Sequence, residues 1–327
     1  MELTTVWFIA IAMLWTGYFV LEGFDFGVGM LYRVLGRNET ERRAAIETIG
    51  PVWDGNEVWL IMAGAATFAA FPEWYATLFS GFYLPLFFIL VGLIVRGVAL
   101  EYRGKRDDPV WRSRMDGMIV AGSVLPALLW GVAFGNIVRG VPLDARHEYV
   151  GSFGTLLNPF ALLGGLTFVA VFVTHGAIFL ALRTTDDLRV RANRLATRAG
   201  AVAAVLTIAF LVWAQELRGG DTASLVLTVA AIAAFAGGLV ANLLRREGWA
   251  FVGTTLAIGL AVVSLFVALF PDVMPSTLPG TSLTAADAAS SPYTLKAMTI
   301  ITAIFLPLVM LYQGWTYWVF RKRVVAA

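Results

Sequence analysis

Nine apolar segments run through the chain, each close to the roughly 20 residues that a helix needs to cross a bilayer. The chain is 59% hydrophobic and only 14% charged, whereas soluble domains carry about 25% charged residues. Unbroken apolar runs indicate helices, because the strands of a membrane barrel alternate over about ten residues. We therefore expect an all-α integral membrane protein with nine transmembrane helices, at residues 6–31, 50–71, 77–100, 117–138, 160–182, 199–217, 223–244, 249–270 and 297–319.

The second segment is the least regular, and an eight-span arrangement would make it re-entrant. Basic residues decide between the two arrangements, because cytoplasmic loops are rich in Lys and Arg. With nine spans, every basic-rich loop falls on one side of the membrane. The N-terminus is then outside and the C-terminus cytoplasmic, and the cytoplasmic loops are those around 33–43, 103–114, 183–198, 245–246 and 321–323.

The residue inventory restricts the cofactors that the chain could bind. There are no cysteines, so disulfides, iron–sulfur clusters and thiolate chemistry are excluded. Of the two histidines, His175 lies in the middle of a span and could ligate a haem, although a polar contact between helices is favoured. His147 lies in a polar loop and is expected to be solvated. The net charge of +2 gives no indication of a nucleic-acid partner.

A polar block, residues 49–61, opens the second span with the sequence IGPVWDGNEVWLI. Polar groups are costly in hydrocarbon and are usually satisfied by partners or used for function. The predicted topology places further ionisable groups at a similar depth. They are Glu22 and Asp25 in the first span, Asp54 and Glu57 in the second, and Arg96 in the third. At about 1.5 Å per residue, Asp25, Asp54 and Arg96 would each lie roughly 6–10 Å from the inner boundary.

Two interpretations of these groups remain open on spacing alone. In the structural one, Arg96 neutralises Asp25 or Asp54 and the cluster joins three helices. In the functional one, the acids form a proton relay from the cytoplasm, because intramembrane carboxylates commonly serve such relays. One basic group against several acids leaves surplus carboxylates, at least one of which can hold a proton. Structural roles are expected for Asn56 and Glu57.

The longest polar stretch, 271–296, is expected to form an ordered or partly ordered external loop. A Ser or Thr near its end is expected to cap the ninth helix, with a partner-docking surface as the alternative. The other loops are short, which favours antiparallel neighbouring helices packed in bundles.

Seven segments carry distinctive motifs, at residues 22–31, 50–61, 96–105, 131–136, 157–159, 271–277 and 294–299. Together these motifs closely resemble subunit II of the cytochrome bd-type quinol oxidases. They cover nearly the whole chain in order, and the Trp-Asp-Gly-Asn block is the most specific of them. The resemblance implies two four-helix bundles plus one peripheral helix, within a single polytopic domain. Bundle one would cover about residues 1–138 and bundle two about 160–320.

The resemblance also implies a partner and a reaction. In that family, subunit I carries two b-type haems and one d-type haem, and subunit II binds none. The complex of the bacterial cytoplasmic membrane oxidises quinol and reduces oxygen to water, taking its protons from the cytoplasm. Subunit II is thus expected to scaffold subunit I and to provide a proton path. Lipid, quinone and a small accessory subunit are the further partners to expect, and nucleic acid is not.

The resemblance assigns roles residue by residue. Asp54 is expected to transfer protons, with Glu101 and Lys105 toward the cytoplasmic mouth. Glu101 stands where many relatives have Asp, so the carboxylate is retained. Trp59 matches a tryptophan placed near an oxygen access path. No catalytic or metal-binding residue is expected in this chain.

Glu22 and Asp25 complete the expected proton path, and Arg96 is expected to be its charge partner. Two other classes of function compete with this assignment. One is a proton-coupled secondary transporter, for which midplane acids and broken helices would be expected. The other is a haem-bearing membrane anchor with His175 as a ligand.

Overall fold

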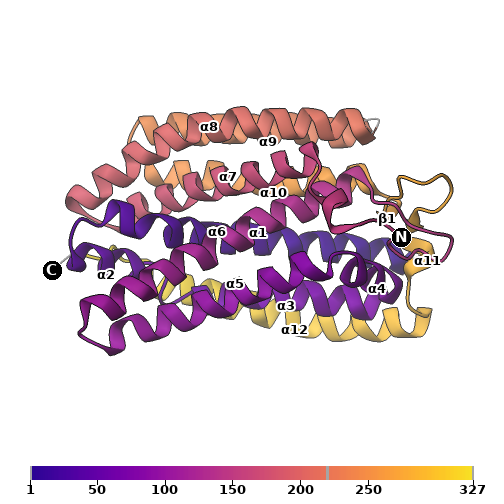
Figure 1. Cartoon of the computed structure of the whole chain (residues 1–327), viewed down its shortest axis with the longest axis horizontal. Helices are drawn as coiled ribbons and strands as arrows, with labels where there is room; N and C mark the ends of the chain where they lie inside the picture. Colours follow the sequence, from indigo (N-terminus) through magenta and orange to yellow (C-terminus); the bar gives the residue numbers. More distant parts are fainter. Residues whose placement is uncertain (1, 219–220, 326–327) are drawn as a thin grey trace.

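Long helices lying side by side make up most of the protein (Figure 1). The computed structural model describes residues 2–218 and 221–325, and the chain is 82% helix. Twelve α-helices are described within these ranges, and they differ widely in length. They are α1 Leu3–Leu35, α2 Glu39–Glu47, α3 Trp53–Ala70, α4 Pro72–Gly81, α5 Tyr83–Tyr102, α6 Pro109–Arg139, α7 Pro159–Arg183, α8 Asp186–Arg218, α9 Thr222–Leu243, α10 Glu247–Leu269, α11 Ala285–Ala288 and α12 Pro292–Val319.

Eight helices of the described ranges are long and apolar enough to cross a membrane. They are α1, α5 with the short 3-10 turn Arg103–Lys105 that follows it, α6 to α10, and α12. This confirms the all-helical membrane class. Helix α3 is not among the eight, because its 18 residues open with the polar side chains of Asp54, Asn56 and Glu57.

The predicted third span, 77–100, starts too early. The helix is interrupted at Phe82, which lies between the end of α4 and the start of α5. Pro85 lies in the first turn of α5 and has no backbone N–H to donate to the preceding turn. A continuous helix through this point would therefore lose a hydrogen bond, and the membrane-spanning helix begins at Tyr83 instead.

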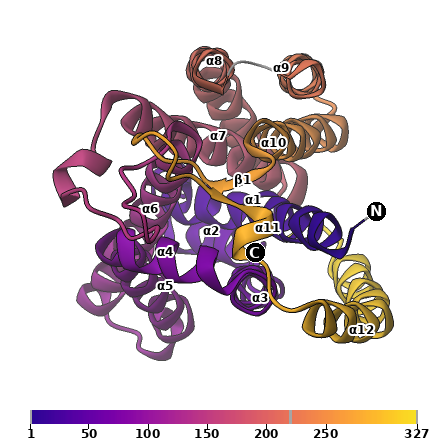
Figure 2. The same ribbon diagram turned by 90° about the vertical axis from the view of Figure 1, so that its right-hand side faces the viewer.

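Helix α1 is the centre of the molecule and packs against α3, α6, α7 and α10 (Figure 2). Its contact with α7 is made by backbone. A Cβ atom built on Gly27 would lie 2.0 Å from the carbonyl oxygen of Phe172 and 2.8 Å from the Cα atom of Gly176. Small residues of this kind let membrane helices approach closely. The acids in the second half of α1 are consequently enclosed on several sides.

The 271–296 loop is ordered, as expected. It contains an antiparallel pair of short strands, β1 (Asp272–Met274) and β2 (Leu283–Thr284), followed by α11. The side chain of Ser291 accepts a hydrogen bond from the backbone N–H of Thr294, which confirms the predicted cap of the last helix. This loop lies at the end where α1 begins, and α2 and the C-terminus lie at the opposite end (Figure 1).

Candidate functional site

A cluster of charged side chains is buried between α1, α3 and α5. Arg96 of α5 is 1% exposed and forms ion pairs with Glu22 of α1 and with Glu57 of α3, the latter at 2.7 Å. Its guanidinium also lies over the Phe26 ring, 4.6 Å from the centroid, which is a favourable cation–π arrangement. The ion pairs of Arg96 in the described ranges thus do not include Asp25 or Asp54, the partners that the structural interpretation gave it. The longer side chains of the two glutamates reach the guanidinium instead.

Asp25 has a different partner. Its Oδ2 accepts a 2.6 Å hydrogen bond from Nδ2 of Asn56, and both side chains are fully buried. The Oδ1 of Asn56 accepts a 2.7 Å hydrogen bond from the Tyr317 hydroxyl and a 3.4 Å hydrogen bond from Nε2 of Gln313. The last helix, α12, therefore contacts the first one through the amide of a residue on α3.

The direction of this hydrogen-bond chain is set at its far end by Trp59. The indole N–H can only donate, and it donates to Oε1 of Gln313 at 2.8 Å. The amide nitrogen of Gln313 is then left to face Asn56. This fixes the Asn56 carbonyl toward α12 and its amide nitrogen toward Asp25. The side chains of α12 thus hold a hydrogen-bond donor against a buried acid.

The sequence reasoning did not identify Gln313 and Tyr317. A signal for both is present, because two polar residues four apart share one face of a largely apolar helix. The signal is weak, because aromatic residues such as Tyr317 near a helix end are usually interfacial.

The cluster is incompletely satisfied by protein groups. Among the described residues, Oε2 of Glu22, Oδ1 of Asp25, and Nε and Nη1 of Arg96 are buried without a hydrogen-bond partner. Three carboxylates, those of Glu22, Asp25 and Glu57, also face one guanidinium. Buried polar groups in this situation are commonly hydrated. The arrangement is chemically suited to hold or pass protons through water.

The remaining predicted residues lie outside this buried cluster. Asp54 is exposed, accepts a 2.7 Å hydrogen bond from the backbone N–H of Gly55, and lies one helical turn before Glu57. Glu57 has a 24% exposed side chain and so connects the buried ion pair to the surface. Glu101 and Lys105 are exposed at the end of α5. Neither makes a salt bridge or a side-chain hydrogen bond within 2–218 and 221–325.

Comparison with known proteins places the chain in a family. A family model described as cytochrome bd terminal oxidase subunit II matches residues 3–320. The chain belongs to this family. Cytochrome bd ubiquinol oxidase subunit 2 of Bacillus subtilis (strain 168) is 42% identical over 332 residues, which cover 99% of this chain and 97% of the relative. Cytochrome bd-I ubiquinol oxidase subunit 2 of Escherichia coli (strain K12) is 38% identical, with 98% and 94% covered.

The fold agrees with the family. The structure of bd oxidase from Geobacillus thermodenitrificans superposes with a TM-score of 0.79, covering 98% of this chain and 100% of that chain. The sequence identity in this comparison is 17%, so the match concerns the fold alone. Family membership over nearly the whole length separates the chain from the transporter considered above.

Oxidases of this family depend on haem, so we asked whether a ring nitrogen of His175 is free to bind a haem iron. Its Nδ1 lies 2.7 Å from the Thr254 hydroxyl, and its Nε2 donates to the backbone carbonyl of Val20 at 3.2 Å. The ring also stacks on Phe251, with 4.7 Å between centroids. Both nitrogens are therefore engaged by protein groups, and His175 does not fit a haem ligand. The predicted polar contact between helices is confirmed.

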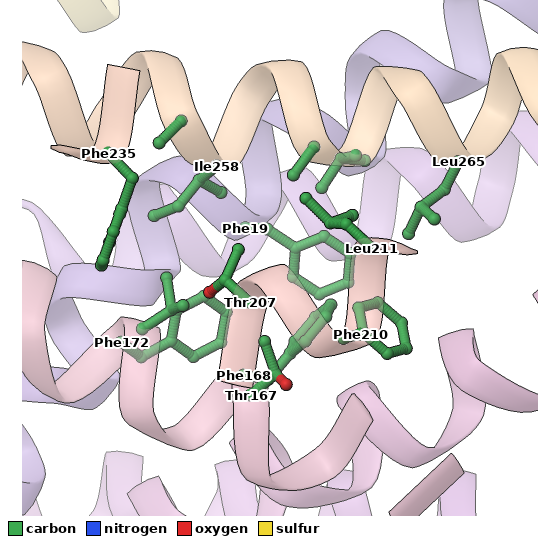
Figure 3. A pocket seen from close by; sticks show the side chains of 14 residues that line it. Phe19, Thr167, Phe168, Phe172, Thr207, Phe210, Leu211, Phe235, Ile258 and Leu265 are labelled. Atoms are coloured by element: carbon green, nitrogen blue, oxygen red, sulfur yellow. The ribbon is translucent and has the colours of Figure 1, made fainter. Parts of the chain in front are cut away.

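Trp59, predicted to lie near an oxygen path, packs on α1. A Cβ atom on Gly17 would lie 2.2 Å from the indole ring, so the ring occupies space that only glycine leaves open. A separate cavity of about 50 Å³ lies between α1, α7, α8, α9 and α10 (Figure 3). Its lining is almost wholly apolar, including Phe19, Phe168 and Phe210. It contains none of the predicted proton-transfer residues.

Proposed function

We propose that the chain is the haem-free second subunit of a bd-type quinol oxidase in a bacterial cytoplasmic membrane. The complex would oxidise quinol and reduce oxygen to water. Membership in the subunit II family over nearly the full length supports this assignment. The engagement of both His175 nitrogens supports the absence of a haem ligand at that position.

The partner is the subunit I of the oxidase, with two b-type haems and one d-type haem, and the two chains form a heterodimer. This chain contributes scaffold and proton access, and redox chemistry stays with the partner. Quinol is the electron donor. Membrane lipid, quinone and a small accessory subunit are further neighbours of the complex.

Helix α3 is the ninth transmembrane helix in this proposal. The spans α1, α3, α5 and α6 form bundle one, at about 1–138, and α7 to α10 form one bundle within 160–320, with α12 peripheral to both. The exposure of α12 supports its peripheral place, because only Leu295 of this helix is buried. The N-terminus is outside and the C-terminus cytoplasmic, in agreement with the basic residues of α2 and of the loop that follows α5.

The buried cluster is proposed as the inner part of a proton path from the cytoplasm. The observation that carries this proposal is that three carboxylates surround one guanidinium, with buried polar atoms that have no hydrogen-bond partner among the described residues. Asp54 and Glu57 connect the cluster to the surface of α3. Glu101 and Lys105 collect protons at the mouth, and Trp59 lies beside the oxygen access path.

Co-purification tests the assignment directly. An affinity tag on this chain, expressed with its cognate genomic neighbours, should retain a haem-bearing membrane protein and quinol oxidase activity. The chain purified alone should show no haem absorption bands. Haem bands retained by the isolated chain would refute the assignment, and so would a stable complex without quinol oxidase activity. Cysteines introduced in the 103–114 loop should react only with reagents that reach the cytoplasmic side.

A further inference from the structure

A polar hollow of about 230 Å³ is lined by residues of α8 and of the end of α9. The two helices lie at one edge of the bundle (Figure 2). Arg194 and Arg198 line it from α8, and Arg245 lines it from the residues that follow α9. The two arginines of α8 are four residues apart and therefore share a helix face. Three guanidinium groups converge on one concave surface.

The positive charge of the hollow is not neutralised by protein groups. In the part of the chain that the structure describes, none of its three arginines has a carboxylate within 4.0 Å. The arginines one or two turns earlier on the same helix, in contrast, do have carboxylate partners. Arg189 pairs with Glu247, and Arg191 pairs with Glu41, each at 2.7 Å. The hollow is thus suited to an anion that the chain itself does not supply.

The floor of the hollow is rigid. Asn193 donates to both the backbone and the side-chain oxygen of Asn242, at 3.0 and 2.8 Å. Asn242 returns hydrogen bonds to the Asn193 backbone at 3.1 Å and to the Thr197 hydroxyl at 2.9 Å. This buried network ties α8 to α9. The backbone positions that carry the arginines are therefore fixed before any ligand arrives.

The surface beyond the hollow changes from charged to apolar. Along α8, the face of Arg194 and Arg198 continues with Val202 and Val205, which are 58% and 67% exposed. On α9, Val240 is 55% exposed. In a membrane these valines face acyl chains, while the arginines lie at the depth of the phosphates. A ligand with an anionic headgroup and apolar tails would contact both the arginines and the valines. A free anion would contact only the arginines.

We infer that the hollow binds the phosphodiester headgroup of an anionic phospholipid, with its acyl chains along α8 and α9. Guanidinium groups bind phosphate oxygens through paired hydrogen bonds, and basic pockets between membrane helices bind anionic headgroups. The leaflet rests on the proposed topology, which makes it the cytoplasmic one. The bound lipid bridges α8 and α9 next to their asparagine pair.

Electron paramagnetic resonance of the purified oxidase complex with spin-labelled lipids tests the site. The pocket variant carries Arg194→Gln, Arg198→Gln and Arg245→Gln. The matched control removes three exposed positive charges elsewhere, and it carries Arg33→Gln, Arg37→Gln and Arg114→Gln. We expect the preference for phosphatidylglycerol over phosphatidylcholine to fall about tenfold in the pocket variant and little in the control. Equal preference in wild type and both variants would refute the site.

Single Arg198→Gln and Arg245→Gln variants should each lose part of the preference for phosphatidylglycerol. These variants provide the same measurement if the triple variant does not assemble. Inorganic phosphate at millimolar concentration should not displace the labelled lipid. If phosphate binds at these arginines and the lipid does not, the lipid assignment is wrong. Labelling of Arg246→Cys from the outside would overturn the proposed topology, while the lipid preference would remain.

Discussion

Nδ2 of Asn56 donates a 2.6 Å hydrogen bond to Oδ2 of Asp25, joining α3 to α1 inside the bundle. The carbonyl of the same amide accepts from Tyr317 of α12. Arg96 of α5 binds the neighbouring acids of the cluster. Four helices, three from the first third of the chain and one from its end, therefore determine the surroundings of one group of acids.

The first prediction concerns Asp54. Asp54→Asn in the assembled oxidase should lower quinol-oxidase turnover by about tenfold or more, because positioned proton transfer contributes about 10²–10⁴ in rate. The haem spectrum of the partner should stay nearly intact, since the side chain is exposed in the isolated chain. Steady-state oxygen consumption and absorption spectra measure the two effects.

The control for Asp54 is Glu101→Gln. This exposed carboxylate should matter less, because water can bypass it. Unchanged turnover in Asp54→Asn would exclude Asp54 from the proton path. Loss of haem in that variant would indicate a structural role for Asp54 at the subunit interface.

The second prediction concerns the buried ion pair. Arg96→Gln leaves Glu22 buried without its cation, and breaking a buried pair costs about 3–5 kcal/mol. The yield and the thermal midpoint of the complex should fall. The double variant Arg96→Gln with Glu22→Gln should recover part of this loss. If the double variant is no more stable than the single one, Glu22 is not charged in the folded protein.

The third prediction concerns the orienting role of α12. Gln313→Leu removes the acceptor of the Trp59 indole and one donor to Asn56. Turnover should fall several-fold in this variant if the cluster belongs to the proton path. Gln215→Leu is the matched control, because Gln215 also makes side-chain hydrogen bonds between helices, to Ser224 and Thr228, but lies on α8, away from the cluster. Equal turnover of the two variants would argue against the orienting role.

The fourth prediction concerns the contact of α1 with α7. Gly27→Ala places a Cβ atom 2.0 Å from the Phe172 carbonyl oxygen, so one helix must shift. Overpacking of this kind costs about 1–3 kcal/mol, which thermal unfolding of the complex should register. Gly64→Ala on α3 is the control, because its Cβ atom meets nothing within 4 Å. Similar midpoints for the two variants would contradict the close backbone packing.

The fifth prediction concerns the pH dependence of an ion pair between α2 and the residues after α5. Hydrogen bonds from Arg103 lower the pKa of Glu39 below its ordinary value of 4.5. The pair therefore stabilises the fold above pH 4.5, and the contribution is lost as the pH falls through the lowered pKa. Glu39 is 41% exposed, so we expect at most about 1 kcal/mol after solvent screening.

Thermal unfolding at pH 7 and at pH 4 or below measures this contribution. Glu39→Gln should lower the midpoint at pH 7, and the difference from wild type should shrink at acidic pH. Glu47→Gln is the control, because its pair with Arg43 is exposed on one helix and should contribute less. A difference that grows on acidification would have the wrong sign.

The sequence predicted the helical membrane class because a bilayer demands about 20 apolar residues per helix, and such runs are visible without a structure. It also placed Glu22, Asp25 and Arg96 near one side of the membrane, because alternating topology brings the end of the first span and the end of the third span to the same side. The cap at Ser291 followed from a local rule. The break at Phe82 was missed, although Pro85 is its local cause.

Only the tertiary structure decided which groups pair within the cluster. Spacing gives the depth of a side chain but not the rotation of one helix against another. Rotation brings Glu57 instead of Asp54 to Arg96 and turns Asp25 toward Asn56. The approach of α12, some 250 residues further along the chain, supplies Gln313 and Tyr317. Helix periodicity and hydropathy are local properties, whereas these pairings depend on how distant helices pack.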